Sequence, residues 1–163
     1  MALHIEKTTK SRISSVDFNN LKFGQLFTDH MFECDFENGE WQTPKIRPYQ
    51  PIAFDPSAKV FHYGQAVFEG MKAYKDDNND IWLFRPDQNQ ERINISAERL
   101  DMPAFPKEYF FEGLTELLKL DKDWVQKGEG NSLYIRPFVI ATENCVSASS
   151  SNKYKFMIIC SPV

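Results

Sequence analysis

The sequence predicts an α+β fold, an antiparallel-rich sheet with two main helices on it. Strand-like runs lie on both sides of two neighbouring segments whose apolar residues recur at helical spacing, so strands are grouped around a pair of helices instead of alternating with them. The chain has 163 residues, of which 42% are hydrophobic, and this is enough for one well-filled core.

The first part of the chain predicts an arm followed by two hairpins. Residues 1–20 are polar and lack periodicity, so we expect an arm outside a domain that covers residues 21–163. The aromatic run at 26–36 is followed by Asn38 and Gly39, a pair typical of a tight hairpin turn. A second hairpin is expected where the strand-like runs MKAYK and IWLFR flank a polar turn.

Two helices are expected in the middle of the chain. The first begins at Pro86, because proline loses no hydrogen bond in the first helical turn. Its buried stripe is Ile93, Ala97 and Leu100. The second helix follows the breaker MPAFP, and its apolar stripe is Phe110, Leu114, Leu117 and Leu118. Two long strands, SLYIRPFVIAT and KYKFMIICSPV, then close the sheet.

Charge and cysteine content limit the class of partner. The formal net charge is −4 with both signs mixed along the chain, so we expect no nucleic acid and favour a small-molecule ligand. Cys34, Cys145 and Cys160 fit neither a disulfide framework nor a metal site, which favours a reducing compartment. Without a secretion signal or a run of about eighteen apolar residues, the chain is expected to be cytoplasmic, with no membrane segment.

The strand at 132–141 carries an arginine among apolar residues. Side chains alternate across a strand, so Tyr134 and Arg136 share one face with Phe138 and Ile140. A guanidinium keeps its charge, and leaving it unpaired in an apolar layer is costly, so it needs an anionic partner. That partner is either a carboxylate of the protein, the commoner case, or the carboxylate of a ligand bound beside the tyrosine hydroxyl.

Arg92 leaves a similar choice open. It lies beside the apolar stripe of the first predicted helix, where it is either solvated or ion-paired, or points into a cavity and binds a phosphate. Tyr63 and Phe68 flank Gly64, and such aromatic residues are more often part of a core. Together with the two guanidiniums, however, they would form a pocket for an anion with an apolar tail.

Five strings resemble, in order and spacing, the N-terminal half of branched-chain amino acid aminotransferases: FGQLFTDHMFECDF, VFHYGQAVFEGMKAY, LFRPDQNQERINISAERL, LYIRPFVIATE and MIICSPV. The resemblance runs from Phe23 to Val163. It implies the small N-terminal domain of a fold-type-IV enzyme that uses pyridoxal 5′-phosphate. The implied reaction is transamination of leucine, isoleucine or valine with 2-oxoglutarate or glutamate, in a homodimer.

The resemblance also assigns roles to residues. It implies that Arg92, in ERINISA, binds the cofactor phosphate and that Tyr134 and Arg136, in LYIRP, face the substrate carboxylates. One site must then accept an aliphatic chain and the second carboxylate of glutamate, since both amino acids use it in turn. The resemblance places aromatic residues around the branched side chain, and these are Phe23, Tyr63 and Phe68.

Other family features lie outside this chain or differ in it. The lysine that holds the cofactor as a Schiff base belongs to the family's C-terminal domain, and no lysine here matches it, so no catalytic residue is assigned. The chain ends at Val163 after a predicted buried strand, and we expect a fragment that binds the cofactor weakly or not at all and does not transaminate alone. The loop ENCVSAS, which in relatives reaches the neighbouring subunit and usually contains a glycine, has Ala148 at the contacting position.

Two alternatives stay open. One is a related fold-type-IV enzyme, a D-amino acid aminotransferase or an aminodeoxychorismate lyase, although FEGMKAY and LYIRPF fit the branched-chain group better. The other is a non-catalytic binding or structural domain that shares the scaffold, which the missing lysine keeps open. A lysine on a strand beyond Val163 would distinguish an enzyme from such a domain.

Overall fold

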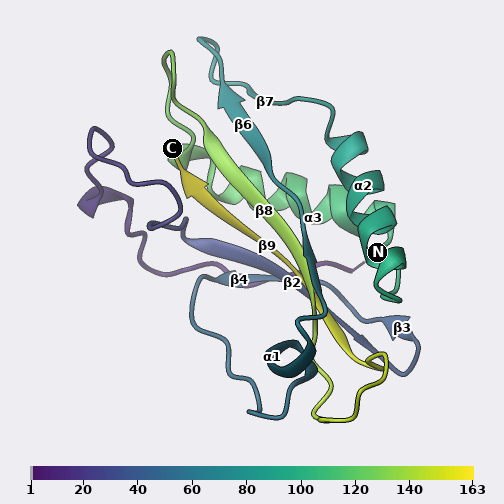
Figure 1. Ribbon diagram of the computed structural model, residues 1–163. Helices are drawn as coiled ribbons and strands as arrows, with labels where there is room; N and C mark the ends of the chain where they lie inside the picture. Colours follow the sequence, from purple (N-terminus) through teal and green to yellow (C-terminus); the bar gives the residue numbers. More distant parts are fainter. Residues whose placement is uncertain (1) are drawn as a thin grey trace.

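A mixed sheet of nine strands organises the chain, and the structure, a computed structural model, describes it for residues 2–163 (Figure 1). The strand order is β1-β4-β2-β9-β8-β6-β7, with β3 paired to β2 and β5 to β8, and only the β1–β4 pair is parallel. The antiparallel-rich α+β fold predicted from the sequence is confirmed. The strands are β1 His4–Ile5, β2 His30–Glu37, β3 Glu40–Trp41, β4 Lys45–Pro48, β5 Ala66–Phe68, β6 Met71–Lys75, β7 Ile81–Leu83, β8 Leu133–Ala141 and β9 Tyr154–Pro162.

Two main helices pack against the sheet: in Figure 1 one lies to the right of the strands and the other passes behind them. They are α2 (Pro86–Arg99) and α3 (Lys107–Leu120), which follow the two predicted helical segments. A third helix, α1 (Lys59–Tyr63), was not predicted; it is a single turn that ends at Gly64, where φ is 61° and a glycine is therefore favoured. Short 3₁₀ turns occur at Ile13–Ser15 and Lys122–Trp124.

Helices α2 and α3 cover one face of the sheet and leave the other partly open. The inward residues of β8 are buried, whereas the alternate residues are only half-buried, as a strand covered on one side requires. The stripe of α3 is buried as predicted, and so are Ile93 and Ala97 of α2. Leu100 departs from the prediction: α2 ends at Arg99, and Leu100 follows it with 44% of its surface exposed.

Both predicted hairpins are present. Asn38 and Gly39 have positive φ angles of 55° and 82° between β2 and β3, which is the geometry that an Asn-Gly turn favours. In the second hairpin, β6 and β7 pair from Ala73–Leu83 to Lys75–Ile81.

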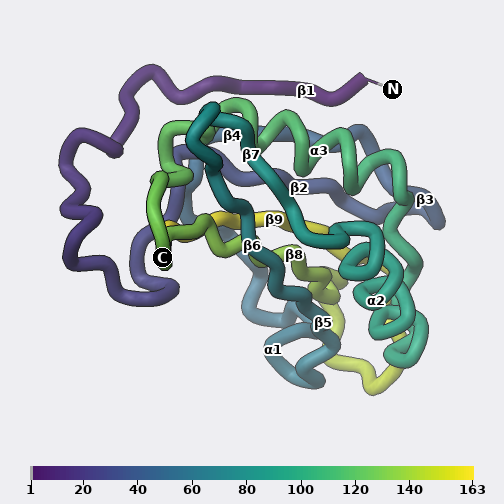
Figure 2. Tube along the Cα trace, turned by 90° about the horizontal axis from the view of Figure 1, so that it is seen from above, coloured from purple at the N-terminus to yellow at the C-terminus, as the bar shows by residue number. Residues whose placement is uncertain are grey.

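The N-terminal arm is attached to the sheet. Seen from above in Figure 2, it runs outside β4, and its strand β1 pairs with β4. The Thr8 amide donates to His30 Nε2 over 2.9 Å, and the Arg12 amide donates to Asp29 Oδ1 over 2.9 Å. The domain boundary at residue 20 stays a prediction.

Candidate functional site

The open face of β8 carries the tyrosine and arginine that the sequence singled out. Arg136 donates from Nε and Nη2 to the Tyr134 hydroxyl oxygen over 2.9 and 2.7 Å, and its guanidinium carbon lies 4.1 Å from the centre of the Phe68 ring. Within residues 2–163, no carboxylate comes within the 4.0 Å that defines an ion pair with Arg136. A hydroxyl and a ring thus orient this cation without neutralising it.

A small hollow adjoins the Arg136 guanidinium. Its volume is 290 Å³. Its walls come from β5, β8 and β9, and all but one of its side chains are apolar: Ala66, Val67, Phe68, Arg136, Phe138, Ile140 and Ile159. One fixed positive charge at the side of an apolar hollow suits a ligand that has a hydrocarbon part and a carboxylate.

Two further features shape the surroundings of Tyr134. The rings of Phe23 and Tyr134 meet edge to face with their centres 5.0 Å apart. A Cβ atom at Gly70 would come 2.7 Å from the Tyr134 hydroxyl oxygen, so glycine leaves the space that the phenol occupies. The structure therefore brings Phe23, Phe68, Tyr134 and Arg136 together.

Tyr63 lies in a different hollow. Its hydroxyl donates to the carbonyl oxygen of Val146 in the loop after β8. The hollow has a volume of 340 Å³, and its lining includes Tyr63 and Ala148, two residues that the sequence analysis named for different roles. Neither of them lines the hollow beside Arg136.

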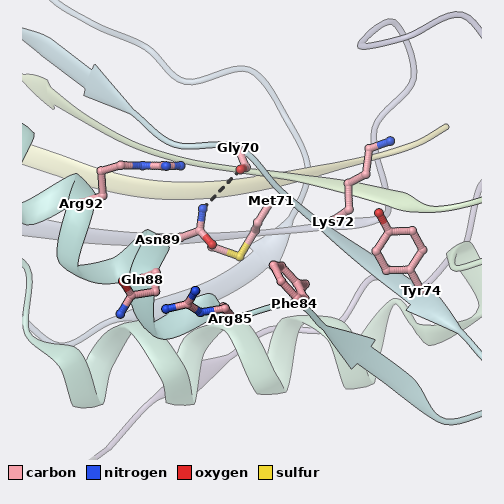
Figure 3. A pocket seen from close by; sticks show the side chains of 9 residues that line it. All are labelled: Gly70, Met71, Lys72, Tyr74, Phe84, Arg85, Gln88, Asn89 and Arg92. Carbon is pink, nitrogen blue, oxygen red and sulfur yellow. Dashed lines mark hydrogen bonds between the residues drawn. The ribbon is translucent and has the colours of Figure 1, made fainter.

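Arg92 points from α2 toward Gly70 in a pocket of 490 Å³ (Figure 3). Unlike Arg136, it has a protein counter-ion: its Nε and Nη2 donate to the two carboxylate oxygens of Glu69 over 2.5 and 2.6 Å. Of the two partners considered for it, the protein carboxylate is thus present. The Arg92 side chain is nevertheless 65% exposed, so the edge of the guanidinium that Glu69 does not use is accessible.

Glu69 holds this arrangement in place. Its side chain is 6% exposed, and it also accepts hydrogen bonds from Asn89 Nδ2 over 2.9 Å and from the Gly70 amide over 3.3 Å. Burial alone raises the pKa of Glu69, but the hydrogen bonds from Arg92 and Asn89 outweigh it and hold the pKa below its usual value. Glu69 is thus an anion that positions Arg92.

Sequence reasoning missed two residues of this region, Glu69 and Lys72. Lys72 is exposed, pairs with Tyr134 across the β6–β8 ladder and lines the same pocket as Arg92. The alternation in MKAYK, with Met71 and Ala73 buried, is the signal that could have placed it on the open face. No local signal pointed to Glu69, because its partner lies 23 residues away on a helix.

The Glu69→Gln substitution is expected to destabilise the chain by about 2 kcal/mol at pH 7. The carboxylate accepts hydrogen bonds from Arg92 with both oxygens, whereas the amide would place an NH₂ donor against one of the Arg92 donors. A carboxyl group with a lowered folded pKa contributes stability above its unfolded pKa, about 4.5, and loses it as pH falls through the folded value. Urea unfolding of the parent chain and of Glu69→Gln, from pH 7 to pH 3, measures the difference in their free energies of unfolding. The difference should shrink below about pH 4.5; a difference that stays constant with pH would contradict the role of the charge.

Metal-binding clusters and membrane-spanning helices are both absent from residues 2–163. No group of three His, Cys, Asp or Glu side chains there is arranged to hold a metal ion. The helices described are all too short or too polar to cross a membrane.

The chain resembles curated proteins over most of its length, although no protein-family model matches it. It is 56% identical to branched-chain-amino-acid transaminase 1 of Bacillus subtilis over 148 residues, which cover 90% of this chain and 42% of that protein. It is 46% identical to the branched-chain-amino-acid aminotransferase of Dictyostelium discoideum in an alignment that covers 99% of this chain and 43% of that protein. The chain is therefore a homologue of branched-chain aminotransferases. It spans about two fifths of the length of these relatives.

Solved structures of branched-chain aminotransferases share the fold. The Escherichia coli enzyme superposes with a TM-score of 0.58 at 20% identity, covering 83% of this chain and 40% of that one. A second branched-chain aminotransferase, solved in complex with N-(5′-phosphopyridoxyl)-L-glutamate, superposes with a TM-score of 0.55 at 25% identity, covering 78% of this chain and 39% of that one. The same enzyme has also been solved with 4-methylvaleric acid.

Proposed function

We propose that this chain supplies the small N-terminal domain of a pyridoxal-phosphate-dependent branched-chain aminotransferase, which exchanges amino groups between leucine, isoleucine or valine and 2-oxoglutarate. The observation that carries the proposal is the guanidinium of Arg136. It is oriented by Tyr134 and Phe68, has no carboxylate partner within residues 2–163 and adjoins an apolar hollow. Such a cation is prepared for an anion that arrives with a ligand.

In this proposal the hollow serves two kinds of amino acid. A branched aliphatic chain is stabilised by contact with the apolar wall that includes Phe68 and Ile159. A glutamate chain extends its second carboxylate to Arg136 and the Tyr134 hydroxyl, where a charge-assisted hydrogen bond compensates for lost water. Phe23 and Tyr63 complete the aromatic surroundings in this proposal.

The pocket that contains Arg92 fits the phosphate of the cofactor. It is lined by three basic side chains, those of Lys72, Arg85 and Arg92, and Glu69 neutralises only one of them. Glu69 occupies one edge of the Arg92 guanidinium and leaves the other for a phosphate oxygen. When bound, pyridoxal phosphate supplies the electron sink for the bonds of the amino acid's α-carbon.

The same proposal covers the parts of the enzyme that this chain does not supply. No lysine here matches the family's cofactor-binding lysine, so we expect the chain alone not to transaminate and to bind the cofactor weakly. The complete enzyme would be a cytoplasmic homodimer that acts on small amino and keto acids, with Ala148 in the loop that approaches the neighbouring subunit.

A fusion protein tests this function. We would join the chain to the part of Bacillus subtilis transaminase 1 that lies outside the aligned region, using that complete enzyme as the reference. The fusion is expected to convert leucine and 2-oxoglutarate to glutamate and the 2-oxo acid of leucine, with glutamate measured by coupled assay. Arg92→Ala should raise the dissociation constant of pyridoxal phosphate about 30-fold, the loss of one charge-assisted hydrogen bond of about 2 kcal/mol.

Two results would contradict the proposal. One is a folded fusion that binds pyridoxal phosphate but does not transaminate any branched-chain amino acid. The other is an Arg92→Ala fusion whose cofactor affinity equals that of the parent protein. Circular dichroism of each protein excludes misfolding as the cause.

A further inference from the structure

A buried lysine fixes the loop that follows β8. Lys59 is the first residue of α1, and its side chain is 1% exposed. Its ammonium nitrogen donates to Ser149 O over 3.0 Å, to Ser149 Oγ over 2.9 Å and to Ser150 O over 2.9 Å, and it lies 3.0 Å from Glu143 Oε2. All four oxygens belong to one stretch of chain, residues 143–152, which we call the 143–152 loop.

These contacts depend on the shape of the loop. A buried ammonium needs acceptors for all of its protons, because an unpaired one costs several kcal/mol. Here the acceptors include two successive backbone carbonyl groups, so the loop backbone must turn both of them inward toward Lys59. Glu143 closes the arrangement from the other end, since its Oε2 also accepts from the Asn152 amide over 2.9 Å.

The C-terminal end of α1 also contacts the 143–152 loop. The Tyr63 hydroxyl donates to Val146 O, four residues along α1 from Lys59. Between these two contacts lies the hollow that Tyr63 and Ala148 share with Ser149. In Figure 1 this is the region where α1 lies next to the loop that joins β8 to β9.

We propose that Lys59 is a positioning residue: it locks the 143–152 loop against α1 and thereby sets the place of Ala148 and the orientation of the Tyr63 hydroxyl. The consequence for substrate binding rests on the proposed function, in which Tyr63 completes the aromatic surroundings of the substrate. The positioning itself does not depend on that function. Lys59 has no role in the chemistry, because its ammonium is enclosed by protein oxygens.

NMR of the full 163-residue chain, labelled with ¹⁵N and with ¹³C at tyrosine Cζ, tests the proposal. In Lys59→Met, the amides of Ser149 and Asn152 should exchange with solvent at least about tenfold faster, because their hydrogen bonds lie within the loop. The Tyr63 Cζ resonance, assigned with Tyr63→Phe, should shift, while that of Tyr134 stays in place. A lysine that only adds stability would leave the Tyr63 resonance unchanged.

A matched control and a milder variant complete the test. Lys153→Met removes an exposed lysine that pairs with Glu37 next to the same loop, and it should leave both readouts unchanged. If Lys59→Met does not fold, Glu143→Gln replaces it as the test variant. We expect a smaller increase in the exchange rates of the Ser149 and Asn152 amides in that variant. Wild-type exchange rates and an unshifted Tyr63 resonance in the folded variant would overturn the proposal, even if the fusion protein transaminates.

Discussion

Replacing Arg136 by alanine is expected to lower kcat/KM for glutamate about 100-fold in the fusion protein, the equivalent of about 2.7 kcal/mol for a lost charge-assisted contact. The kcat/KM for leucine should fall by less than about threefold, because the apolar wall of the hollow remains. The reason for the difference is that only the glutamate chain brings a second carboxylate. Separate measurement of the two half-reactions, by the change in cofactor absorbance, gives both values.

Two control variants separate charge from orientation. Arg136→Lys keeps the charge but lacks the planar guanidinium that Tyr134 orients. Its kcat/KM for glutamate should therefore lie between those of the parent protein and Arg136→Ala. Tyr134→Phe removes the hydroxyl that accepts both guanidinium bonds while keeping the ring against Phe23. If Arg136→Ala lowered kcat/KM equally for glutamate and leucine, the residue would have another role, such as supporting Phe68.

The largest effect on stability is expected from Gly113→Ala, at about 3 kcal/mol of destabilisation. Gly113 is buried in α3, and a Cβ atom there would come 2.2 to 2.8 Å from three ring atoms of Phe32. The ring cannot move aside easily, because it is fully buried and meets the stacked rings of Phe105 and Phe156 edge to face. Alanine stabilises a helix relative to glycine by only about 1 kcal/mol, so the clash outweighs this gain and the substitution is destabilising overall.

Urea unfolding followed by circular dichroism measures this effect. Thr115→Ala, an exposed position two residues further along α3, is the matched control and should change stability by less than about 0.5 kcal/mol. If Gly113→Ala is as stable as the parent chain, the close packing of α3 on β2 described above is wrong.

Elements with a strong local signal could be predicted from the sequence. The Asn38–Gly39 turn and the stripe of α3 follow from residue type and spacing alone. Helix α1 could not be predicted in this way, because five residues are too few to show a helical period and its place depends on contacts with the distant loop.

The site shows the same division between local and long-range information. Alternation along β8 correctly placed Tyr134 and Arg136 on one face. Spacing could not decide which arginine has a protein counter-ion, since the Glu69–Arg92 pair forms only when α2 packs beside β5 and β6. The burial of Lys59 was likewise invisible, because its acceptors lie about 90 residues further along the chain.

The most direct test is a crystal structure of the fusion protein with N-(5′-phosphopyridoxyl)-L-glutamate. We expect the side-chain carboxylate of the glutamate part within about 3 Å of Arg136 and the Tyr134 hydroxyl, and the phosphate on the free edge of Arg92. A ligand whose side-chain carboxylate binds elsewhere, with Arg136 still held only by Tyr134, would contradict the account.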